Sequence, residues 1–148
     1  MTQLSPNARK VARRVLEHET KGRQDAEDLG RAINRACVEI HQELVNLIGP
    51  AGVHVLIGRA LHLAKKDFPC LEGVAPVAGQ SGCLQGVSES LQGRDPMEAE
   101  ASVVAVLAHL IQLLTSFLGE ELGLHPIRRI WPEVVSGNMT SQTQETRQ

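Results

Sequence analysis

The chain has 148 residues, of which 42% are apolar, and its formal net charge at neutral pH is −2. A domain of this length can bury a sizeable core without a disulfide or a metal, and its near-neutral charge argues against a dedicated nucleic-acid-binding protein, which would be clearly basic. With two Phe, one Trp and no Tyr, the core must consist of Leu, Ile, Val and Ala, which favours helices over a β-sandwich.

The first half of the chain predicts three helices. Ser5-Pro6 is an N-cap followed by Pro at the first helical position, so a helix is expected from Pro6 to about Thr20. A second helix is expected from about Gln24 to Ile48, either separate from the first or continuous with it. Gly49-Pro50 ends this helix, and a third amphipathic helix then runs to Phe68-Pro69.

The second helix carries a narrow apolar stripe whose members alternate steps of three and four residues. This spacing is close to the heptad seam of a coiled coil. We therefore expect the stripe to pair with a second copy of the chain or with a partner protein. The predicted interface residues are Leu29, Ile33, Ala36, Ile40, Leu44 and Leu47.

A loop from Cys70 to Gly82 and a short helix containing Leu84, Val87 and Leu91 precede the longest predicted helix, from Asp95 to Gly123. Its residues 103–118 are apolar on every side, and such a helix must be enclosed by protein or lipid. The run is shorter than the roughly 20 residues that span a bilayer, so we expect no membrane insertion. The prediction is an all-α fold, a bundle of four to six helices around one long apolar central helix.

Pro126 is expected to open a last short helix over residues 127–131, which Pro132 stops. Residues 1–135 then form a single helical-bundle domain, and the polar residues 136–148 form a disordered tail. Arg128 and Trp131 on the last helix are candidate interface residues, because Arg and Trp are enriched in binding hot spots. The alternative is that Trp131 closes the core.

Six histidines raise the question of a metal site. No two of them are three or four residues apart, the spacing that would place both on one face of a helix. We therefore predict no metal and no cofactor. A site assembled from His54, His62 and His109, which are distant in sequence, stays open as an alternative.

His109 and Gln112 interrupt the apolar run of the predicted central helix. They are either solvent-facing or hydrogen-bonded core groups, or they form a polar seam at an interface or pocket. The second possibility leads to an alternative function, a helical sensor that holds a small apolar ligand or a metal between helices, near His62, Cys83 and His109.

The three cysteines, Cys37, Cys70 and Cys83, are odd in number and lack C-x-x-C spacing. This usage suits reduced thiols, and no secretory signal is recognisable at the N-terminus, so we expect a cytoplasmic protein. Arg9 and Arg13 belong to a basic group on the first helix that could hold phosphates. No aromatic residue accompanies it for base stacking, and a solvated helix face is the commoner explanation.

Two segments resemble small uncharacterised helical proteins of bacteria. The first is Arg59-Ala60-Leu61-His62-Leu63-Ala64, which runs into Phe68-Pro69. The second is Phe117-Leu118-Gly119-Glu120-Glu121-Leu122, which leads to Ile130-Trp131-Pro132-Glu133. The resemblance implies a bacterial origin and carries no activity, cofactor or catalytic position.

No spacing in the chain pairs a nucleophile with a base, or two carboxylates, on one helix face. The leading prediction is therefore a non-catalytic interaction or regulatory module. The central helix and the stripe on the second helix together present more apolar surface than the short remaining helices can cover. A homodimer or a partner protein would supply the missing surface.

Overall fold

The computed structural model describes residues 4–22, 25–77 and 84–134. The tail predicted over residues 136–148 and the thiol of Cys83 lie outside these residues. The described residues are mostly helical, which confirms the all-α fold class. The elements are α1 (Pro6–Thr20), α2 (Ala26–Asp67), the 3-10 helix η1 (Pro69–Leu71), β1 (Ala75–Pro76), β2 (Leu84–Gln85), α3 (Val87–Leu91), α4 (Pro96–Leu118) and α5 (Glu120–Ile130).

The first predicted helix is confirmed at both ends. The Ser5 hydroxyl accepts a hydrogen bond from the backbone N–H of Ala8 at 3.0 Å, which satisfies one of the unpaired donors at the helix start. Lys21 ends α1 in the left-handed conformation, with φ +56°. The α1 and α2 helices are therefore separate, and α2 begins with its own cap, Asp25.

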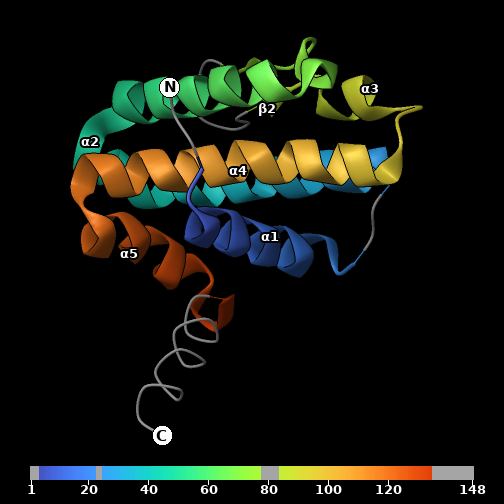
Figure 1. Cartoon of the computed structure of the whole chain (residues 1–148). Coiled ribbons are helices and arrows are strands. Elements are labelled where there is room, and N and C mark those ends of the chain that lie inside the picture. The colour runs from blue at the N-terminus through green and yellow to red at the C-terminus, as the bar shows by residue number, and fades with distance from the viewer. Residues whose placement is uncertain (1–3, 23–24, 78–83, 135–148) are drawn as a thin grey trace, which may run out of the picture.

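The second and third predicted helices form one element, α2, with a sharp bend between them. Gly49 lies at the bend with φ +83° and ψ +157°, a conformation that glycine adopts without strain, and Pro50 starts the next helical segment. At Gly49-Pro50, where the sequence predicts the end of one helix and the start of the next, the structure has a bend. The chain turns back there, so that both segments of α2 run alongside α4 (Figure 1).

The predicted start of the long helix at Asp95-Pro96 is confirmed, but the predicted boundary between the last two helices is wrong. The break falls at Gly119, with φ +90° and ψ +160°, so α4 ends at Leu118 and α5 begins at Glu120. Gly123 lies inside α5 and does not cap the long helix. Pro126 also lies inside α5. The proline deprives the Leu122 carbonyl of its helical N–H partner, and Leu122 is exposed, so water can reach this part of the backbone.

A small two-stranded ribbon, which the sequence analysis does not predict, closes the region between α2 and α3. The strands β1 and β2 pair antiparallel, with Ala75 opposite Gln85 and Pro76 opposite Leu84. The side-chain oxygen of Asn34 on α2 accepts a hydrogen bond from the Leu84 N–H at 2.9 Å. This bond fastens the ribbon to α2.

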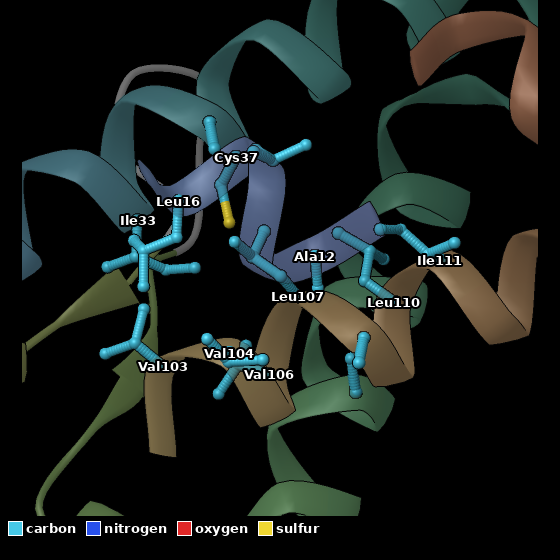
Figure 2. Packing of buried hydrophobic residues seen from close by; sticks show 14 of the residues in the cluster. Ala12, Leu16, Ile33, Cys37, Val103, Val104, Val106, Leu107, Leu110 and Ile111 are labelled. Atoms are coloured by element: carbon cyan, nitrogen blue, oxygen red, sulfur yellow. The ribbon is translucent and has the colours of Figure 1, made fainter. Parts of the chain in front are cut away.

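The core lies where α4 packs against α1, α2 and α5. In α4 every residue from 102 to 111 is buried. Figure 2 shows side chains from three helices meeting in the core, among them Leu16 of α1, Ile33 and Cys37 of α2, and Leu107 of α4. Each fully buried Leu or Ile contributes about 1.5–3 kcal/mol of transfer free energy, and this apolar contact determines where the helices lie.

Two of the described helices, α2 and α4, are long and apolar enough to cross a membrane by length and composition alone. The core helix of a soluble protein meets the same criterion. In α4, 61% of the most apolar window is buried within the protein, whereas in α2 the fraction is 28%. Of these two helices, α2 therefore has the larger part of its apolar window outside the core.

Candidate functional site

The stripe predicted as an interface on the second helix lies mostly inside the chain. Five of its six members are at most 1% exposed, and these are Leu29, Ile33, Ala36, Ile40 and Leu44. The first segment of α2 therefore directs this stripe into the core of its own chain, where α1, α4 and α5 cover it. Only Leu47, next to the bend, keeps an exposed side chain.

Among the described residues, three of the five exposed large apolar side chains lie near the two corners of the fold, and Val55 and Met97 are the other two. Leu47, close to the bend in α2, is 62% exposed, and Phe117 and Leu122, on either side of the α4–α5 corner, are 66% and 63% exposed. Figure 1 shows the bend of α2 and the α4–α5 corner at the same end of the molecule. We call these three side chains the corner surface.

Two contacts link the helices that carry the corner surface. Arg129 of α5 forms an ion pair with Glu43 of α2, with Nε and Oε1 2.9 Å apart, which joins the two elements that meet at this end. At Gly123 a Cβ atom would lie 2.6 Å from the Cα of Thr115, so the backbones of α4 and α5 are in direct contact. These contacts connect α5 to both α2 and α4.

Trp131 closes the core, as the alternative interpretation proposed. Its side chain is buried, and its indole Nε1 donates a hydrogen bond to Glu19 Oε2 at 2.8 Å. The other carboxylate oxygen of Glu19 accepts from Arg35 at 3.0 Å. One carboxylate on α1 thus fixes the end of α5 and also contacts α2. This cluster is a structural tie, and it buries Trp131 away from any partner.

A second carboxylate lies within electrostatic range of this cluster. Burial, and after it the negative charge of Glu19, raises the pKa of Glu39 above its ordinary value.

The Nε atom of Arg128, on the last turn of α5, is buried and has no hydrogen-bond partner among the described residues. The side chain of Arg128 as a whole is partly buried.

His109 is buried in the core of the chain, with 3% of its surface exposed. Neither ring nitrogen has a hydrogen-bond partner among the residues that the structure describes. Burial lowers the pKa of His109, Asp67 opposes this effect and Arg9 adds to it. An unpaired polar group in a core is uncommon and costs stability. Gln112, three residues further on, accepts a hydrogen bond from the Ser5 N–H at 2.6 Å.

Replacing His109 by Leu is expected to increase stability by about 1–2 kcal/mol, because an unpaired buried polar group is replaced by an apolar one of similar size. Because the pKa of His109 is lowered in the folded chain, the unfolded chain takes up this proton at a higher pH than the folded chain does. Stability of the native protein should fall as the pH drops below 6.5, by up to ~1.4 kcal/mol per pH unit. Urea unfolding at pH 7.5 and 5.5 measures both effects.

The exposed His54 on α2 supplies the control for this experiment. His54→Gln removes an imidazole from an exposed position and should leave the stability at pH 7.5 unchanged, whereas His109→Leu should raise the stability and reduce its dependence on pH. If His109→Leu destabilised the protein, the prediction would be wrong, because the imidazole would then contribute favourable contacts to the core.

The two described residues of the predicted sensor site lie in different environments. His62 is exposed on α2, His109 is buried in α4, and Cys83 lies outside the described residues. Within residues 4–22, 25–77 and 84–134, no three His, Cys, Asp or Glu side chains gather in a way that could hold a metal ion. Cys37 and Cys70 are buried and are not joined in a disulfide.

Two hollows lie along α1. One of about 290 Å³ lies between α1, the end of α2 and α4, with Phe68, Val104 and Ala105 among its walls and Arg9 and Arg13 beside it. We call it the Arg9 cavity. The other, of about 630 Å³, is wide open. It is lined by Lys10, Arg13, Arg14, Glu17, His18, Glu133 and Val134.

Comparison with known proteins does not place this chain in a family. No family model matches its sequence, and neither a curated protein nor a solved structure is significantly similar to it. The function is therefore proposed from the geometry of the chain itself.

Proposed function

We propose that this protein is a non-catalytic interaction or regulatory module that associates with a second copy of itself through the corner surface. The observation that carries the proposal is the exposure, above 60%, of Leu47, Phe117 and Leu122 around the corners at one end of the fold. Apolar side chains scattered singly over a surface are ordinary, whereas a group of them marks an interaction site.

The arrangement of the chain supports a symmetric assembly. A two-fold dimer places the same patch of both subunits in contact and is the commonest form of self-association. The polar residues Glu120 and Glu121, at the exposed start of α5, would lie at the rim of such a contact, as in typical interfaces with an apolar centre and a polar margin. A partner protein with a complementary apolar patch is the alternative occupant.

The proposal includes the finer features of the fold. We interpret the molecule as a bundle organised around α4, an interpretation supported by the packing of α1, α2 and α5 against this helix. We also propose that it works in the cytoplasm without inserting into a membrane. Cys37 and Cys70, which are buried and not joined in a disulfide, are consistent with a reducing compartment.

Replacing Leu47 or Phe117 by Lys is expected to weaken self-association by about 30-fold or more, because loss of a central apolar contact costs ~2 kcal/mol or more. The measurement is the mass in solution across a concentration series, by size-exclusion chromatography with light scattering. Both positions are exposed in the single chain, so the melting temperature of the isolated subunit should stay the same.

Met97 at the start of α4 provides a matched control. It is also a large exposed apolar residue, at 75%, but it lies at the opposite end of α4 from the corner surface. Met97→Lys should leave the mass unchanged. A native protein that stays monomeric at all concentrations, or a Met97 variant that dissociates as readily as the Leu47 variant, would contradict the proposal.

A further inference from the structure

The lining of the Arg9 cavity combines apolar and charged side chains. Its walls include the side chains of Leu4, Phe68, Val104 and Ala105, which come from three separate parts of the chain. Its volume of about 290 Å³ lies near the lower end of the range of roughly 300–1,000 Å³ that small-molecule sites occupy. The space therefore suits a small ligand with an apolar body.

The charged groups at this cavity are two guanidinium groups and one carboxylate. Arg9 and Arg13 lie one turn apart on α1, and Asp67 is the last residue of α2. In the part of the chain that the structure describes, none of the three takes part in an ion pair. The site thus carries one net positive charge, and its guanidinium donors are available for a ligand. A guanidinium binds a carboxylate through two parallel hydrogen bonds.

The buried imidazole of His109 lies next to this site along α4. His109 follows Ala105 by one helical turn, so the two residues share a face of the helix. Arg9 and Asp67 both act electrostatically on His109, and both line the cavity. A neutral imidazole offers one donor and one acceptor, and both nitrogen atoms are unpartnered among the described residues. A buried polar group without a partner costs stability, and natural proteins tolerate such costs mainly at functional sites.

We infer that the Arg9 cavity binds a small monocarboxylic acid with an apolar body, held by its carboxylate at Arg9 and Arg13 and by its apolar part against Phe68, Val104 and Ala105. The single net positive charge matches a monoanion. A dianion such as a phosphate monoester would place its second charge close to Asp67, which argues against it. This inference is independent of the corner surface, which lies at the bend of α2 and at the α4–α5 corner.

Titration with sodium octanoate tests the inference, with binding followed by calorimetry and by chemical-shift changes of backbone amides. The native protein is expected to bind octanoate saturably, with shifts centred on Phe68 and Ala105. The neutral analogue 1-octanol and the cation octylammonium should bind more weakly. Arg9→Gln or Arg13→Gln should raise the Kd by about tenfold or more, because a hydrogen bond to a charged group contributes ~1.5–3 kcal/mol.

Lys10→Gln is the matched control, because it removes the same charge from the same helix at a residue that lines the open hollow instead. Its Kd for octanoate should equal that of the native protein. Ala101→Leu, at a partly exposed wall position, should fill the cavity and abolish binding while the protein stays folded. Absence of saturable binding, equal binding of 1-octanol, or equal weakening by Lys10→Gln would each overturn the inference.

Discussion

Gly123→Ala is expected to destabilise the protein by about 3 kcal/mol or more, at the upper end of the range for overpacked sites. An added Cβ would lie 2.6 Å from the Thr115 Cα and 2.7 Å from the Leu114 carbonyl oxygen. These are backbone atoms of α4, which cannot move aside as the end of a flexible side chain can. The methyl group can be accommodated only if α5 moves away from α4, and that movement would open the contact beneath Trp131 and Ile127.

Thermal and urea unfolding of the isolated protein measure this effect, and a fall in melting temperature of roughly 10 °C corresponds to the expected loss. Gly58→Ala is the control. Gly58 is also a helical glycine, but its nearest contact with an added Cβ would be Pro76 Cγ at 3.8 Å, an ordinary distance. Alanine should be neutral there or stabilise by up to ~1 kcal/mol. Similar losses for both variants would show that helix propensity, and not the approach of α5 to α4, governs the effect.

The role of Gly123 also shows how far the sequence determines the fold. Helical periodicity and caps locate α1 and the bend at Gly49 correctly, because these signals depend on neighbours in the chain. Near residue 120 two glycines, Gly119 and Gly123, offer the same terminating signal. Only tertiary packing distinguishes them, since one needs a positive φ and the other a close approach between helices. The prediction therefore placed the end of the long helix four residues late.

The candidate site follows from the sequence only in part. Leu47 belongs to the predicted stripe, but the spacing that identifies the stripe cannot tell a seam between subunits from a seam inside one chain. The burial of Ile33 and Ile40 depends on how α1 and α4 fold over α2. The Arg9 cavity joins residues that are far apart in sequence, such as Arg9, Phe68 and Val104. No local pattern indicates their proximity. Phe117 and Leu122 belong to no apolar stripe that predicts an interface, and their exposure is a result of the corner at Gly119.

Trp131→Ala is expected to cost about 3–5 kcal/mol, the usual range for removing a large buried aromatic side chain. Two effects combine at this position. The indole fills space between α5 and α1, and its loss also removes the hydrogen bond to Glu19. The Glu19 carboxylate, with a side chain only 8% exposed, would then keep Arg35 alone as a partner. Because Arg35 is itself more than half exposed, this ion pair compensates little.

Trp131→Phe separates the two effects, because it keeps most of the apolar volume and removes the donor. We expect it to cost about 1–3 kcal/mol, the penalty for an unsatisfied buried acceptor. A double-mutant cycle with Glu19→Gln, measured by urea unfolding, should give a coupling energy of about 0.5–3 kcal/mol between the two side chains. If Trp131→Phe were neutral, or the two variants were strictly additive, the hydrogen bond would not contribute. Trp131 would then hold α5 on α1 through packing alone, and Glu19 would contribute only through its ion pair with Arg35.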